Sequence, residues 1–123
     1  MTSKRSVKVC SYQSVQANQF RAELEAAGLK RAKVCISAVE GLIILARGPV
    51  VAVKNSQGSS SSPVHAMGMI IQMGLARFDV ASKSYSLTPA GVEYHEQLQA
   101  KGLTESALQC RARINQFAQE VAA

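Results

Sequence analysis

Few side chains in this sequence have the types and the spacing that catalysis needs. The 123 residues include two histidines, His65 and His95, and one aspartate, Asp79. Glu93, His95 and Glu96 are close in sequence, but neighbouring positions on a helix point apart, so they predict a solvated surface. A catalytic triad or a paired-carboxylate site needs a recognisable cluster. We therefore expect that the protein is not an enzyme.

The three cysteines, Cys10, Cys35 and Cys110, do not predict a metal site or a disulfide framework. Their number is odd, and no CxxC or HxxxH spacing is present. Such usage is typical of a reducing cytosol, and paired spacing is what zinc sites show. The most apolar stretch, residues 41–53, is too short to cross a bilayer and is interrupted by Arg47-Gly48-Pro49. We expect a cytoplasmic protein with no metal, no cofactor and no membrane contact.

The charges that remain favour contact with a polyanion. The net charge is +6, and residues 1–54 contribute all of it, with nine bases and three acids. Residues 55–123 are neutral, with five of each. A basic half of this kind attracts nucleic acid. The alternative is that the bases serve solubility and a loose N-terminus.

The first half of the chain predicts two helices and one short ambiguous segment. Residues 1–13 predict an extended or flexible basic segment. Ser14 is a suitable N-cap for a helix over residues 14–27. Residues 31–46 predict a second helix, whose AVEGLIILA stretch is apolar nearly all round and therefore belongs at the centre of the fold. Val50–Val53 predicts either a strand or one poor helical turn.

The second half predicts a helix, a hairpin and a helix with little linker between them. A hydroxyl N-cap precedes a proline twice, at Ser62-Pro63 and at Thr88-Pro89, and each pair predicts a helix start. The predicted elements are a helix from Pro63 to Met73 ended by Gly74, strands over Leu75–Val80 and Tyr85–Leu87, and a helix from Pro89 to Gly102 with Ala90, Gly91, Tyr94 and Leu98 inward.

A last helix, starting near Thr104, carries apolar residues at alternating spacings of three and four. This is the seam of a coiled coil. It predicts either packing on the protein's own core or a contact with a second copy, and we favour the dimer, because small helical domains often need a partner to bury such a stripe. The residues of this seam are Leu103, Ala107, Cys110, Ile114, Phe117 and Val121.

The order of these elements resembles a winged helix-turn-helix domain of the MarR/PadR type. The resemblance covers Arg31 to Leu98 and rests on four pieces of sequence in the expected order: Ala46-Arg47-Gly48-Pro49, Ser61-Ser62-Pro63-Val64-His65, Met73-Gly74-Leu75-Ala76-Arg77-Phe78 and Tyr85-Ser86-Leu87-Thr88-Pro89-Ala90-Gly91. It implies an α+β, mostly α fold with a winged-helix domain over residues 14–102. Residues 103–123 would be a C-terminal dimerisation helix.

The same resemblance implies a homodimeric transcriptional regulator that binds double-stranded DNA in a sequence-specific manner. The helix after Pro63 would enter the major groove, and the hairpin would contact the adjacent backbone. The residues implied to meet DNA are Lys54, Ser60, Ser61, Ser62, His65, Met69, Gln72, Arg77 and Lys83.

An alternative function arises because the presumed recognition helix has no Lys or Arg. DNA affinity depends largely on neutralising phosphates. Gly68 and Met69, predicted to face outward, would suit a protein partner, since Met adapts to irregular surfaces. The alternative is therefore a winged-helix adaptor or inhibitor, of a kind found in phage and mobile elements, that grips a protein.

Overall fold

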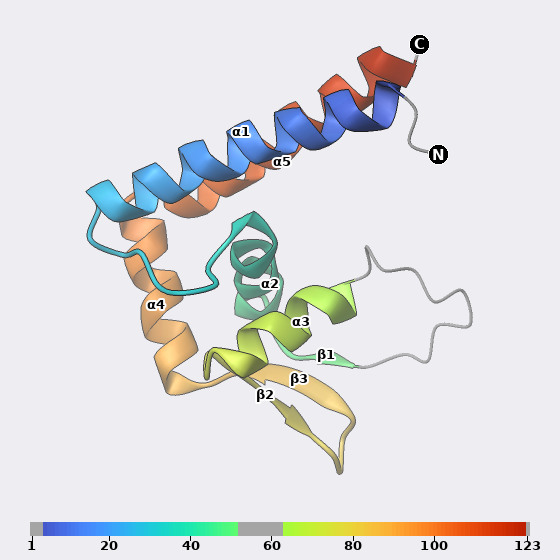
Figure 1. Cartoon of the computed structure of the whole chain (residues 1–123). Helices are drawn as coiled ribbons and strands as arrows, with labels where there is room; N and C mark the ends of the chain where they lie inside the picture. The colour runs from blue at the N-terminus through green and yellow to red at the C-terminus, as the bar shows by residue number, and fades with distance from the viewer. Residues whose placement is uncertain (1–3, 52–62, 123) are drawn as a thin grey trace.

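The computed structural model describes residues 4–51 and 63–122, and the side chains of residues 8–51 and 66–121. The described part is mostly helical, with one small antiparallel sheet (Figure 1). Its helices do not include one that is both long and apolar enough to cross a membrane. The elements are α1 (Lys4–Ala26), α2 (Ile36–Ala46), β1 (Val50–Val51), α3 (Pro63–Gln72), β2 (Ala76–Asp79), β3 (Ser84–Leu87), α4 (Pro89–Ala100) and α5 (Leu103–Ala122).

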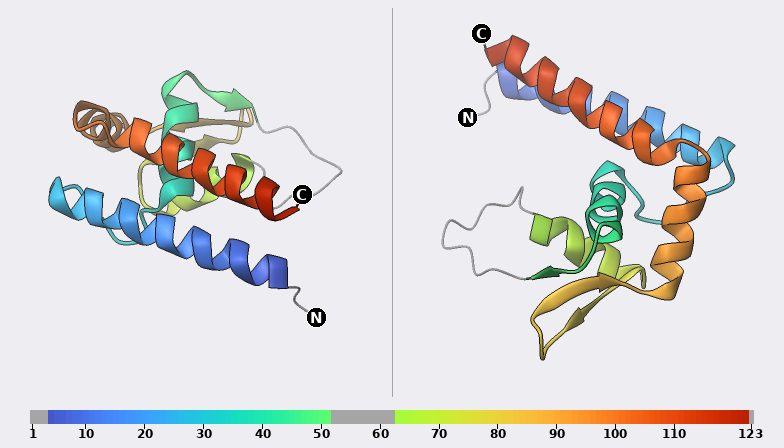
Figure 2. Two further views of the ribbon diagram at one scale, coloured as in Figure 1. Left: turned by 90° about the horizontal axis from the view of Figure 1, so that it is seen from above. Right: turned by 180° about the vertical axis from the view of Figure 1, so that it is seen from behind.

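Helices α1 and α5 form a long antiparallel pair that lies across one side of the molecule. Figures 1 and 2 show them side by side, with both termini at the same end and the other elements beneath the opposite half. Polar contacts join the pair: the Ser106 hydroxyl donates to the Glu23 carboxylate at 2.9 Å, and Arg113 Nε donates to Gln16 Oε1 at 2.9 Å. These contacts join the two helices at the middle of the pair and at the end away from the termini.

The core surrounds α2, as the apolar sequence of that helix predicts. Val39 and Leu42 of α2 are fully buried, and so are Met67 of α3 and Leu98 of α4. A helix that is apolar all round has no polar face to turn toward water. It is therefore stable only when other elements cover it on several sides. Helix α2 is therefore the support on which α3, α4 and α5 pack.

The three strands pair in the order β1-β3-β2, all antiparallel. Residues directly opposite each other share a face, so the register fixes which side chains point to the core. Phe78 and Val50 both lie opposite Tyr85 and share its face, whereas Arg77 lies opposite Ser86 on the outer face. The prediction of a returning hairpin is confirmed, and Val50–Val51 is a strand rather than a helical turn.

The prediction of a loose N-terminus is wrong for residues 4–13, because α1 starts at Lys4 rather than at Ser14. No proline or glycine interrupts the chain before Gly28. The added turns pack against α5, where the Tyr12 ring stacks on Phe117 with ring centroids 4.4 Å apart. Tertiary packing of this kind stabilises a helix whose own sequence predicts it weakly.

The second helix also begins later than predicted, at Ile36 rather than near Arg31. Lys33 has a φ of +69°, and Cys35, the N-cap, is extended. A lysine in the left-handed region cannot continue a right-handed helix. Residues 30–35 are therefore part of the loop that connects α1 to α2 rather than the first turn of a helix.

The predicted start of α4 is confirmed. Thr88 is the N-cap, its Oγ1 accepts from the Gly91 backbone N–H at 3.1 Å, and Pro89 is the first helical residue. Gly91, Tyr94 and Leu98 face the core as expected, but Ala90 is exposed, so its predicted inward position is wrong. The buried residues recur at three- and four-residue intervals from Gly91, and Ala90 lies one position outside that stripe.

Replacing Thr88 by alanine should destabilise the protein by about 1–2 kcal/mol through the loss of an N-cap. The effect should lie toward the upper end of the usual range, because Thr88 Oγ1 also donates to the Gly74 carbonyl at 2.8 Å. Thr88→Ser, which keeps both hydrogen bonds, is the control. Urea unfolding followed by circular dichroism measures the difference, and equal stability of the two variants would contradict this role.

The predicted seam of α5 is filled largely from within the chain. Leu103, Ala107, Cys110 and Ile114 are buried in the single protomer, where α5 packs on α1, α2 and α4. For these four residues the structure shows the alternative in which the seam packs on the protein's own core. Their side chains are not available to a second copy. The outer seam positions, Phe117 and Val121, are only half-buried.

Candidate nucleic-acid interface

Helix α3 has one buried and one exposed face. Met67 and Ile70 are fully buried against the core, whereas Gly68 and Gln72 are exposed and Met69 is half-buried. The apolar residues recur at intervals of three and four, which is why a single face of the helix is drawn inward. The helix therefore lies on the surface, and the outward side chains that the structure describes carry no charge.

The C-terminal end of α3 is held by a Schellman motif. The Leu75 N–H donates to the Ile70 carbonyl at 2.9 Å and the Gly74 N–H to the Ile71 carbonyl at 3.0 Å. Gly74 has a φ of +76°, which glycine adopts without steric penalty. Because Thr88 Oγ1 donates to the Gly74 carbonyl, the end of α3, the base of the hairpin and the start of α4 are fixed at one place.

The outer face of the hairpin next to α3 is polar. Arg77 is exposed, and its Nε donates to Ser86 Oγ across the strands at 3.4 Å. Asp79 and Ser84 lie opposite each other on the same face, nearer the tip. This face offers a guanidinium and hydroxyl groups, which can hydrogen-bond phosphate oxygens, together with the Asp79 carboxylate, which repels them.

The tip of the hairpin is ordered by Asp79. The Ser82 hydroxyl donates to Asp79 Oδ2 at 2.8 Å and the Ala81 N–H to Oδ1 at 3.2 Å. These hydrogen bonds hold the pKa of the Asp79 carboxyl below its ordinary value. Because the pKa of Asp79 is lower in the folded than in the unfolded state, its ionised form stabilises the turn at pH values above the unfolded-state pKa. This stabilisation is lost as the pH falls through the folded-state pKa.

Lys83 completes this turn with a φ of +52° and an exposed side chain. For a residue with a Cβ, this left-handed conformation costs about 1 kcal/mol relative to an ordinary one. Val80 at the same tip is 77% exposed and Phe78 is 40% exposed. The tip thus presents one cation together with two apolar side chains.

The structure brings together only part of the surface that the sequence predicts. Met69 and Gln72 lie on α3, directly before the hairpin that carries Arg77 and Lys83. His65 belongs to α3, but its side chain is outside the described set. The predicted contacts Lys54, Ser60, Ser61 and Ser62 lie outside the described residues.

The sequence prediction missed one basic segment near this surface, the loop Lys30–Lys33. It contains three cations within four residues, and all of them are exposed. Figure 1 shows this loop above α3 and the hairpin below it. The run of bases after Gly28 was the available signal. The predicted helix started at Arg31, however, and so placed Arg31 and Lys33 on a helix rather than in a loop.

No family model, curated protein or solved structure matches this chain. The assignment of a function therefore depends on the geometry of the chain itself. In the part that the structure describes, no three side chains of histidine, cysteine or carboxylate type gather as metal ligands would.

Proposed function

We propose that this protein is a winged helix-turn-helix regulator that binds double-stranded DNA. Helix α3 would be the recognition helix and the β2–β3 hairpin the wing. The observation that carries the proposal is the direct passage from α3 into an antiparallel hairpin, with the short strand β1 added beside β3 and α2 behind both. An α-helix fits the major groove, and a hairpin fixed beside it reaches the adjoining backbone.

The distribution of polar groups supports this assignment. The exposed face of α3 has no carboxylate that would repel phosphate, and Gln72 can form the paired hydrogen bonds by which glutamine recognises adenine. Arg77 and Lys83 on the wing supply positive charge next to the helix, and the exposed Asp79 carboxylate between them offsets part of it. In this arrangement α3 contacts bases, and positions outside α3 contact phosphates.

The protein would act as a homodimer, with the ends of α1 and α5 that carry the termini as the contact. Those ends extend past the other elements (Figure 2). Phe117 and Val121 there are half-buried, which leaves apolar surface that a second copy would cover. Two recognition helices related by a two-fold axis would suit a roughly palindromic site.

Binding to a mixed-sequence duplex, followed by fluorescence anisotropy between about 50 and 200 mM salt, tests the proposal. The wild-type protein should lose affinity steeply as salt rises. The double variant Arg77→Ala/Lys83→Ala should bind more weakly to every sequence. Its plot of log K against log salt should be shallower by about 1.8 per protomer, or 0.9 for each lost phosphate contact. Absence of duplex binding at low salt would refute the proposal.

A second function, binding of a protein partner by the same fold, is favoured by the exposed apolar residues of the hairpin. Phe78 packs against Tyr85, with ring centroids 4.9 Å apart, yet remains substantially exposed, as does Val80. Exposed apolar side chains that lie together mark surfaces at which proteins bind one another. Under this alternative the wild-type protein binds no duplex at low salt.

A further inference from the structure

We infer that the loop Lys30–Lys33 is a second phosphate-binding element, which contacts the DNA backbone on the side of α3 opposite the wing. The inference rests on the proposed function. It begins from a deficit: a recognition helix without Lys or Arg must obtain its charge neutralisation from neighbouring segments. A helix lying in a major groove about 12 Å wide has a phosphate backbone on each side. The wing accounts for one side only.

Two lysines on the flanks of α3 share an unusual backbone conformation. Lys33 and Lys83 are the only non-glycine residues with positive φ among those described, at +69° and +52°. Glycine or asparagine adopts this region more easily, and strained residues concentrate at functional sites. One of the pair lies in the α1–α2 loop and the other at the wing tip, so both flanking segments present a lysine from a fixed, left-handed backbone.

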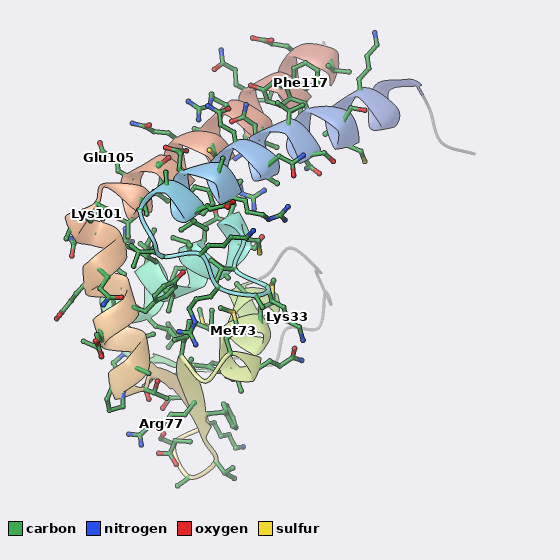
Figure 3. The ribbon with its side chains drawn as sticks, turned by 60° about the vertical axis from the view of Figure 1, so that its left-hand side comes forward. Lys33, Met73, Arg77, Lys101, Glu105 and Phe117 are labelled. Carbon is green, nitrogen blue, oxygen red and sulfur yellow. The ribbon has the colours of Figure 1, made fainter. Side chains whose placement is uncertain are left out.

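The position of Lys33 fits this role. Figure 3 shows Lys33 on one side of Met73, at the end of α3, and Arg77 on the other. Figure 1 agrees, with the loop above α3 and the hairpin below it. Among the described residues, no carboxylate lies within ion-pair distance of Lys33 or Lys83. Both ammonium groups are therefore able to meet phosphate.

Contacts with α4 hold the loop in place. The Tyr94 hydroxyl donates to the Leu29 carbonyl at 2.6 Å, and the Arg31 guanidinium lies over the Tyr94 ring, 5.2 Å from its centroid. Burial raises the pKa of Tyr94, which favours the protonated phenol that donates this hydrogen bond. Preorganised charges bind a rigid partner without first losing conformational freedom.

Two carboxylates lie near the loop, but they do not neutralise its positive charge. Glu25 approaches Lys30 at 3.7 Å, and both side chains are largely exposed, so the pair is weak and can exchange for phosphate. Glu93 lines the same shallow cleft as Lys30 and Arg31, on the α4 side. Lys33, at the far end of the loop, has no ion-pair partner among the described residues.

The test compares Lys33→Gly with Lys101→Gln in the full-length chain. Glycine removes the charge and suits the left-handed backbone, so Lys33→Gly should melt at the wild-type temperature or higher. It should bind mixed duplex more weakly at about 0.1 M salt, by roughly eightfold for each protomer and so about sixtyfold for a dimer, with a salt slope shallower by about 0.9 per protomer. Lys101 is exposed and lies away from α3 in Figure 3, so Lys101→Gln should keep the wild-type slope.

The possible outcomes distinguish a failure of this inference from a failure of the proposed DNA binding. If the wild-type protein and Lys33→Gly bind duplex with the same slope, the loop makes no phosphate contact and the inference is overturned, while DNA binding stands. If Lys101→Gln lowers the slope as much as Lys33→Gly, net charge explains the effect and the inference is again overturned. If the wild-type protein binds no duplex, the proposed function fails and the inference fails with it.

Discussion

Replacing Gly91 by alanine should destabilise the protein by about 3 kcal/mol, near the upper end of what overpacking in a tight core produces. A Cβ at this position would overlap the backbone carbonyl oxygen of Leu75 and crowd its carbonyl carbon. The obstacle is backbone, so a change of rotamer cannot relieve it. The Leu75 carbonyl also accepts from the Thr88 N–H at 3.0 Å, so moving it would weaken the joint between α4 and the hairpin.

The melting temperature should fall by about 10 °C or more for a domain of this size, as measured by circular dichroism. Gly68→Ala is the matched control, because Gly68 is an exposed helical glycine with open space where its Cβ would lie. That substitution should stabilise the protein by about 0.5–1 kcal/mol through helix propensity alone. If both variants melted at the same temperature, α4 would not pack against the Leu75 backbone as described.

Local chemistry made the second half of the fold predictable. At Thr88-Pro89 the threonine hydroxyl accepts a hydrogen bond from a backbone N–H at the start of α4, and at Gly74 a glycine adopts the positive φ that ends α3. The alternation from Leu75 to Leu87 set the hairpin, because residues of period two can bury only one face. These signals act over a few residues and require no knowledge of the rest of the chain.

The N-terminal half was less predictable because distant contacts decide it. Residues 4–13 become helical against α5, whose partner residue Phe117 lies about a hundred positions away. The late start of α2 depends on Lys33, whose left-handed backbone no local pattern indicates. Of the candidate interface, helix α3 and the β2–β3 hairpin could be predicted. The loop could not, since its position follows from Tyr94 holding Leu29 and Arg31.

Replacing Ile114 by aspartate should destabilise the fold of each protomer rather than only separate a dimer. Ile114 is 4% exposed and belongs to the core cluster. A carboxylate there would be removed from water without a partner, which typically destabilises a protein by about 4 kcal/mol. Urea unfolding should show this loss at any protein concentration, because the buried surface belongs to a single protomer. Ile114→Val, which removes one methylene, should cost only about 1 kcal/mol.

The outer seam provides the test of the dimer that Ile114 cannot provide. Val121 is only half-buried, near the end of α5 where both termini lie. Val121→Asp should therefore leave the fold intact and yield monomers in sedimentation, if a second copy covers that end. A folded Val121→Asp that sediments like the wild-type protein would refute the contact. The same heptad spacing runs through both positions, but only the inner one is enclosed by α1 and α2, and this difference in burial separates a core residue from an interface residue.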